Sequence, residues 1–173
     1  MDQSRLLAVA ILGAWVAMTV CMWVAASGSF RTVKRVLEGS NPQFTEATKP
    51  MTPDQKRVVL RYLTSEINRT YFRAYGWAQL ALGALLLGLL LRSAPRSVIN
   101  LALAGAMLAL AAILTLYITP EVVALGRQID FVPRDPAPPE MPRFRALHGA
   151  FAGLDGTKLL AAVFMLGRMI LAR

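Results

Sequence analysis

The sequence predicts an all-α polytopic membrane protein in which four transmembrane helices form one bundle. The chain has 173 residues, 55% of them hydrophobic, and its charged residues are concentrated between long apolar stretches. A helix of roughly 20 apolar residues crosses the ~30 Å core of a bilayer, and four such helices use more than half of this chain. The predicted spans of this single domain cover about residues 6–29, 74–91, 97–119 and 146–171, with loops at 30–73 and 120–145.

The first apolar stretch is predicted to be a span and not a cleaved signal peptide. Its apolar core is too long for a signal peptide, and residues 1–5 carry no net positive side-chain charge. Cys21 is the only cysteine, so intramolecular disulfides and CxxC metal or redox sites are excluded.

The loop before the second span is predicted to contain an amphipathic cytoplasmic helix. Thr52 has the properties of an N-cap, with Pro53 in the first turn and Gln55 closing a capping box. Such a helix can lie on anionic headgroups, although a solvated basic helix without lipid contact fits the same pattern. Its apolar face comprises Val59, Leu63 and Ile67, its basic residues are Lys56, Arg57, Arg61, Arg69 and Arg73, and the aromatic residues expected at the membrane interface are Tyr71, Phe72, Tyr75 and Trp77.

The second and third spans are joined by only five residues, 92–96, which forces an antiparallel helical hairpin. Pro120 is predicted to end the third span, because proline lacks the N–H that a helix needs. A short interfacial helix at 121–131 and a proline-rich tether then lead to the fourth span. Small residues in the third span recur at intervals that predict close helix packing; they are Ala102, Gly105, Ala106 and Ala109.

The distribution of positive charge predicts the orientation. The net charge is +9, and the two large loops hold thirteen Lys and Arg residues against five on the opposite side of the membrane. The positive-inside bias places these loops in the cytoplasm of a bacterium and both termini outside its inner membrane. The basic charge is therefore not interpreted as nucleic-acid binding. The expected partners are membrane lipids and a larger membrane complex or further copies of the chain in a homo-oligomer.

The fourth span carries two charges at membrane depth. Asp155 and Lys158 are spaced i, i+3, which permits an ion pair, and His148 lies on the same stripe. An Asp or Lys at the centre of a span costs roughly 2.5–3.5 kcal/mol, so we expect both to face the bundle interior. If the spans alternate in direction, Thr19 lies level with Asp155, and Gln79 lies level with His148. This predicted polar site is either functional, as an ion path or a ligand counter-charge, or structural, as a neutralised pair that fixes helix register.

Other chemistry has weaker support. The sequence contains no phosphate-binding glycine loop, no Ser/His/Asp arrangement and no metal-ligand cluster. Thiol and thioether ligands suit Cu(I), but methionine in apolar helices is more often a packing residue. A single histidine cannot provide bis-histidine heme ligation within one chain. We therefore predict no catalytic residue, cofactor or metal site; the sulfur residues considered are Met18, Cys21, Met22, Met165 and Met169.

Short motifs in three of the spans resemble those of a known family. They are Gly13-Ala14-Trp15 and Met22-Trp23-Val24 in the first span, the end of the third span at Pro120, and Phe144-Arg145-Ala146-Leu147-His148-Gly149 at the start of the fourth. They resemble the transmembrane protein 205 family, a four-span domain, and the resemblance covers most of the chain outside residues 32–69. That family typically has Asn where Asp155 stands here, and Lys158 adds a second charge.

The same family is distantly similar to copper-resistance D proteins and to the membrane protoporphyrinogen oxidase that uses heme. Those relatives typically place a histidine in the first span, and this chain has none there. We therefore expect a non-enzymatic inner-membrane protein that acts as an accessory or assembly-type component. The alternative is a small ion- or metal-handling carrier, or a copper-resistance-like protein, that uses His148, Asp155 and Lys158. A heme oxidoreductase fits these residues least.

Overall fold

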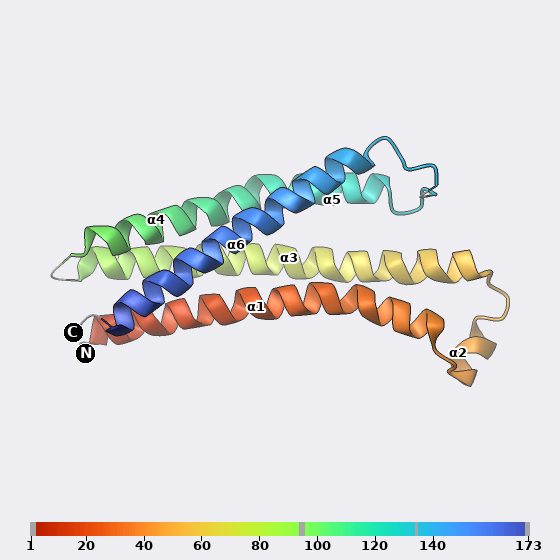
Figure 1. The fold of residues 1–173 in the computed structure, drawn as a ribbon, viewed down its shortest axis with the longest axis horizontal. Coiled ribbons are helices and arrows are strands. Elements are labelled where there is room, and N and C mark those ends of the chain that lie inside the picture. The colour runs from red at the N-terminus through yellow and green to blue at the C-terminus, as the bar shows by residue number, and fades with distance from the viewer. Residues whose placement is uncertain (1–2, 94–95, 134, 172–173) are drawn as a thin grey trace.

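The computed structural model describes residues 3–93, 96–133 and 135–171, and this part of the chain is all-α. Its elements are α1 (Gln3–Glu38), α2 (Pro42–Ala47), α3 (Pro53–Arg92), α4 (Val98–Ile113), the π-helical turn η1 (Leu114–Ile118), α5 (Thr119–Gln128) and α6 (Met141–Leu171). Four helices, with α4, η1 and α5 counted as one, are long and apolar enough to cross a membrane, which confirms the predicted fold class. They alternate in direction, and both termini lie at the same end of the bundle (Figure 1). We call this the terminal end, and the opposite end the basic end.

The two longest helices extend well beyond a bilayer core. α3 has 40 residues and is therefore about 60 Å long, whereas the hydrocarbon core is ~30 Å thick. The basic segment before the second span is the first half of α3, and the helix continues from it into that span. Its capping box is confirmed, because the Gln55 N–H donates to Thr52 Oγ1 (3.2 Å) and the Thr52 N–H donates to Gln55 Oε1 (2.7 Å).

The third helix does not stop at Pro120, where the third span is predicted to end. The helix continues through η1 into α5, so that Val98–Gln128 is one helical segment of 31 residues. Proline lacks an N–H, and its ring crowds the carbonyl four residues earlier. The π-turn lies directly before Pro120 and widens the helix where these carbonyls need room. The predicted interfacial helix at 121–131 is accordingly the end of this same helix.

Two apolar clusters fill the bundle, one towards each end. The cluster at the terminal end is centred on Leu12, Trp15, Leu86, Ala104, Met107, Ala162 and Met165. The cluster at the basic end contains Met22, Tyr75, Leu114, Ile118 and Phe151. Three of the sulfur side chains considered for copper, those of Met22, Met165 and Met169, therefore pack in the core.

The closest helix approach does not involve the small residues predicted for it. Three of them are exposed, and a Cβ added to Gly105 would meet no atom within 4 Å. On α3, Gly76 is the tighter of two positions, because an added Cβ would lie 2.7 Å from Thr115 Oγ1. Gly83 is the other, because an added Cβ would lie 2.9 Å from Leu108 Cδ1 and from the Trp15 ring. The glycine allows α3 to approach α1 and α4. The exposed residues are Ala102, Ala106 and Ala109.

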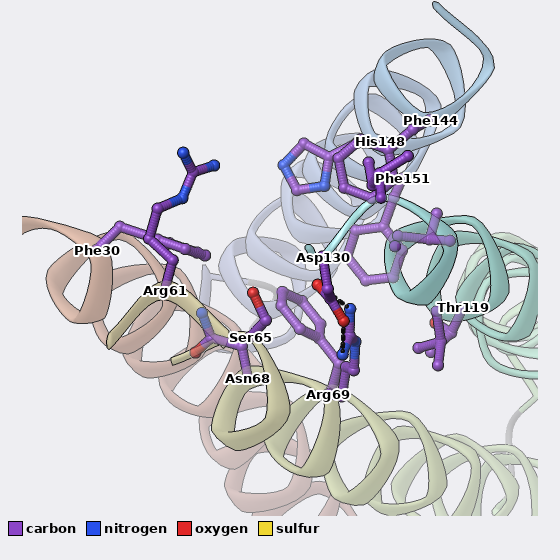
Figure 2. A pocket seen from close by; sticks show the side chains of 15 residues that line it. Phe30, Arg61, Ser65, Asn68, Arg69, Thr119, Asp130, Phe144, His148 and Phe151 are labelled. Atoms are coloured by element: carbon purple, nitrogen blue, oxygen red, sulfur yellow. Dashed lines mark hydrogen bonds and ion pairs between the residues drawn. The ribbon is translucent and has the colours of Figure 1, made fainter. Parts of the chain in front are cut away.

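Polar contacts connect the helices at both ends of the bundle. At the terminal end, Arg5 donates from Nε (2.8 Å) and Nη2 (2.6 Å) to the carbonyl oxygen of Met169, in the last turn of α6. At the basic end, Arg69 on α3 donates to both carboxylate oxygens of Asp130, each at 2.8 Å (Figure 2). Arg69 also donates to Glu66 (2.6 Å). These bonds hold the segment that follows α5 against α3.

Candidate functional site

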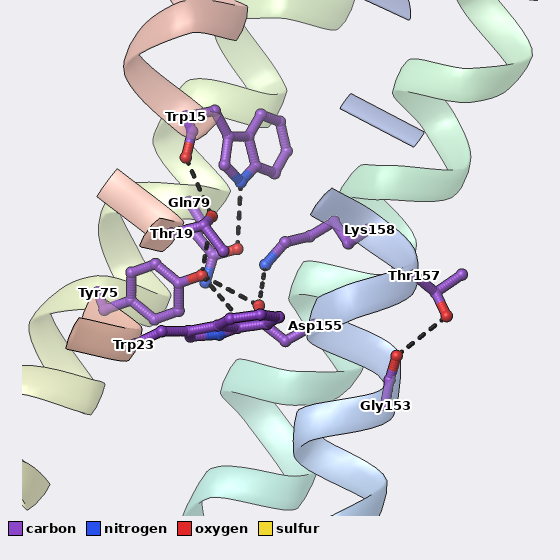
Figure 3. Close-up of polar contacts among 9 residues, drawn as sticks. All are labelled: Trp15, Thr19, Trp23, Tyr75, Gln79, Gly153, Asp155, Thr157 and Lys158. Carbon is purple, nitrogen blue, oxygen red and sulfur yellow. Dashed lines mark hydrogen bonds and ion pairs between the residues drawn. The ribbon is translucent and has the colours of Figure 1, made fainter. Parts of the chain in front are cut away.

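A buried network of polar side chains lies in the middle of the bundle (Figure 3). Asp155 and Lys158 form an ion pair within α6, and their side chains are 0% and 1% exposed. The Asp155 carboxylate also accepts a hydrogen bond from Trp23 Nε1 on α1 (2.7 Å) and one from the Tyr75 hydroxyl on α3 (3.0 Å). Three helices therefore supply donors to one carboxylate, which compensates its loss of water.

The network continues from Tyr75 towards the terminal end. The hydroxyl oxygens of Tyr75 and Thr19 lie within hydrogen-bond distance (3.0 Å), and Thr19 donates to the carbonyl of Trp15 (3.0 Å). Trp15 Nε1 donates in turn to Gln79 Oε1 (3.1 Å). Gln79 therefore lies on the Trp15 side of the network, and its predicted position level with His148 is wrong.

Aromatic rings surround the charged pair. Lys158 Nζ lies 5.2 Å from the centroid of the Tyr75 ring and 6.0 Å from that of Trp15. The π-faces attract the ammonium group where water is excluded. Trp23 packs against Gly156, where an added Cβ would lie 3.6 Å from the indole ring. With 40% of its surface exposed, Trp23 covers the carboxylate from outside the bundle.

The structure brings together four of the five predicted polar-site residues and separates His148 from them. His148 is exposed and stacks on Phe144, with ring centroids 6.0 Å apart. It shares a face of α6 with Asp155, but α6 crosses the bundle diagonally and begins beside α5 (Figure 1). The same face of α6 therefore borders a cavity at His148. The four residues in the network are Thr19, Gln79, Asp155 and Lys158.

The aromatic hydrogen-bond donors were not predicted from the sequence. Tyr75, predicted to lie at the membrane interface, is only 5% exposed. Trp15, Thr19 and Trp23 recur every four residues along α1, which places three polar groups on one helix face. This spacing is the signal by which both tryptophans could have been identified.

The basic residues predicted to face lipid divide into two groups. Arg69 is not lipid-facing, because its side chain is only 10% exposed and is bound to Asp130 and Glu66. This part of the prediction is wrong, because the pairing of Arg69 with Asp130, 61 residues away in the sequence, was not predicted. Lipid contact of the others stays a prediction. Arg57, Arg61 and Arg73 are exposed and Lys56 is half-buried.

A cavity of about 250 Å³ lies at the basic end between α1, α3, α5 and α6 (Figure 2). Aromatic side chains form much of its wall, and Arg61, His148 and the Arg69–Asp130 pair supply its ionisable groups. The aromatic residues are Phe30, Phe72, Phe144 and Phe151.

Metal binding has little structural support. Within the described ranges, no group of three or more His, Cys, Asp or Glu side chains is arranged to hold a metal ion. Cys21 is exposed, whereas neighbouring Met22 is buried, so the two do not face a common site. The network and the cavity are the two candidate sites that geometry defines. No family model, curated protein or solved structure matches this chain.

Proposed function

We propose that this chain is a non-enzymatic integral protein of the bacterial inner membrane that acts as an accessory or assembly-type component. The observation that carries this proposal is the saturation of the Asp155 carboxylate by donors from α1, α3 and α6. A buried ion pair adds little net stability, and its best-attested role is to specify one arrangement of helices. The network accordingly gives the bundle one register and a rigid outer surface.

Directional bonds matter more between helices in lipid than in water. Lipid tails are as apolar as core side chains, so helix association depends on close packing and interhelical hydrogen bonds. A shift of α6 by one residue would rotate Asp155 by about 100° and leave the donors on Trp23 and Tyr75 unpaired. Such a network supports a scaffold that presents a fixed surface to a membrane partner.

The alternative is a carrier that moves an ion or metal through His148, Asp155 and Lys158. A carrier needs its cargo to reach the charged pair, but both side chains are at most 1% exposed and aromatic rings surround them. His148 lies outside the network, in the wall of the cavity. These two features favour the scaffold.

The orientation and the family are part of the same proposal. The connections at the basic end, which hold thirteen Lys and Arg residues, face the cytoplasm, and both termini lie outside. We also propose membership of the transmembrane protein 205 family. Two residues of the motifs that resemble this family, Trp15 and Trp23, belong to the network, which gives these motifs a structural purpose.

The double variant Asp155→Asn/Lys158→Met tests the proposal. It removes both charges and largely preserves side-chain volume, so a scaffold should keep its fold and its co-purifying membrane partner, identified by mass spectrometry in mild detergent. Thr157→Val is the matched control, because Thr157 is exposed and donates to the Gly153 carbonyl (3.0 Å), away from the network (Figure 3). A double variant that folds normally but loses ion flux measured in proteoliposomes would instead establish the carrier.

A further inference from the structure

The cavity at the basic end lies where the four predicted spans end. Phe30 follows the first span, Phe72 precedes the second, Thr119 ends the third and Phe151 lies near the start of the fourth. These residues line one cavity, so it lies at the level of the membrane–water interface on the side of the basic loops. A lipid molecule can enter at this depth with its headgroup in water and its chain among apolar side chains.

Arg61 supplies a positive charge to this cavity. It lies seven residues before buried Asn68 and fourteen before buried Tyr75, which places it on the inward-facing side of α3. Arg69 is already bound to Asp130 in a bidentate pair. Arg61, by contrast, forms no ion pair among the described residues. No acid among the described residues therefore compensates this guanidinium group.

A second hollow of about 570 Å³ adjoins the cavity and shares Phe30 and Arg61 with it. Three further cations line this hollow against one acid, Glu38, so its net charge is positive. Lys56, like Arg61, has no ion-pair partner in the described parts of the chain. The combined surface thus has a cationic half and an aromatic half. The three cations are Lys34, Lys56 and Arg57.

We propose that this combined surface binds one anionic phospholipid. Its phosphate contacts Arg61 and Lys56, and one acyl chain enters the cavity against the edge-to-face ring pair of Phe72 and Phe151, whose centroids are 5.2 Å apart. Arginine binds phosphate oxygens through paired N–H donors, and basic pockets between transmembrane helices recognise anionic headgroups. The site is distinct from the predicted basic helix lying flat on the membrane, because Arg61, although exposed, lines both hollows. It does not depend on the role of the Asp155–Lys158 network.

Native mass spectrometry of the full chain in detergent tests this site. The protein is titrated with phosphatidylglycerol and with phosphatidylcholine of the same acyl chains. We expect one tightly bound phosphatidylglycerol, and roughly 10- to 150-fold weaker binding in Arg61→Gln, since a hydrogen bond to a charged group contributes about 1.5–3 kcal/mol. Arg73→Gln is the matched control, because Arg73 is exposed on the same helix and does not line either hollow. Its affinity should equal that of the wild type.

A second variant tests the apolar half of the site. Val123 lines the cavity, so Val123→Trp should fill it and weaken phosphatidylglycerol binding to a similar degree while every charge is kept. Three results would each overturn the proposal. Arg61→Gln and Arg73→Gln could bind phosphatidylglycerol equally, the wild type could bind both lipids with equal affinity, or Val123→Trp could bind phosphatidylglycerol as the wild type does. Competition by soluble glycerophosphoglycerol at the concentrations at which the lipid binds would also overturn it, because the site would then recognise a headgroup alone.

Discussion

Two ion pairs in the described part of this protein, one buried and one partly buried, lie in different surroundings. Asp155 and Lys158 are one turn apart on a single helix, at most 1% exposed, and the carboxylate accepts further bonds from two other helices. Arg69 and Asp130 are separated by 61 residues in sequence, and their side chains are 10% and 8% exposed near the basic end. The first pair occurs where apolar clusters close on both sides, and the second borders a cavity.

The difference shows how the depth of a charge determines its structural role. The Asp155 network has no access to water, so its partners must all come from the protein, and their positions specify the helix arrangement. The Arg69 pair has a second acid, Glu66, which itself lies 3.8 Å from Arg127. If Asp130 is lost, Glu66 still pairs with Arg69. The Arg69–Asp130 pair therefore holds the segment after α5 against α3 but does not specify the arrangement of all four helices.

The largest effect is expected from Lys158→Met alone. It leaves Asp155 buried without its counter-charge, which should lower the free energy of unfolding by about 3–5 kcal/mol. The double variant Asp155→Asn/Lys158→Met should regain most of this loss, because no charge then remains in the core. Equilibrium unfolding in mixed micelles measures both variants. Equal stability of the single and double variants would contradict the assigned role of the pair.

Asp130→Asn should have a smaller and more local effect. It weakens the bidentate pair with Arg69 but leaves Glu66 in place, so a loss of about 1.5–3 kcal/mol is expected. Hydrogen exchange should increase around the end of α5 and remain unchanged in the middle of α6. Arg143→Gln is the control, because its pair with Glu121 is exposed and should contribute nothing resolvable. Faster exchange throughout α6 would show that the two ion pairs are not independent.

Gly83→Ala tests close packing at the level of the network. The added methyl group would lie 2.9 Å from two neighbouring side chains and should cost about 1–3 kcal/mol. Gly88→Ala, on the same helix, meets no atom within 4 Å and should stabilise the helix by about 0.5–1 kcal/mol. Thermal unfolding measures both variants, and we expect Gly83→Ala to lower the unfolding temperature and Gly88→Ala to raise it. Stabilisation by both would show that α3 can move away from α1 and α4.

Tyr75→Phe is expected to have the smallest effect. It removes one of the donors to Asp155 and keeps the ring beside Lys158, and interhelical hydrogen bonds in membrane proteins contribute on average about 0.6 kcal/mol. Tyr117→Phe is the matched control, since Tyr117 is 63% exposed. A loss in Tyr75→Phe as large as that in Lys158→Met would show that the hydroxyl, and not the ammonium, is the main partner of the carboxylate.

Much of the fold could be predicted because it depends on local properties. Long apolar runs require helices in a bilayer, and the Thr52 capping box needs only residues three positions apart. The continuation of the third helix past Pro120 could not be predicted, because neither composition nor spacing indicates the π-turn that precedes this proline. The prediction that the small residues of the third span pack against another helix failed, because their spacing places them on one helix face but does not show which residues, if any, contact that face.

By itself, the sequence determined that Asp155 and Lys158 turn inward, because exposure of either charge to acyl chains would cost more than their burial as a pair. Only the tertiary structure decided which side chains satisfy them. The diagonal path of α6 brings it close to Trp23 and Tyr75 at one level, and away from α1 at the level of His148 (Figure 1). Helix crossing depends on the packing of all four helices together, so residues on one stripe of α6 have different neighbours: a saturated polar network in the core and an open cavity at the membrane surface.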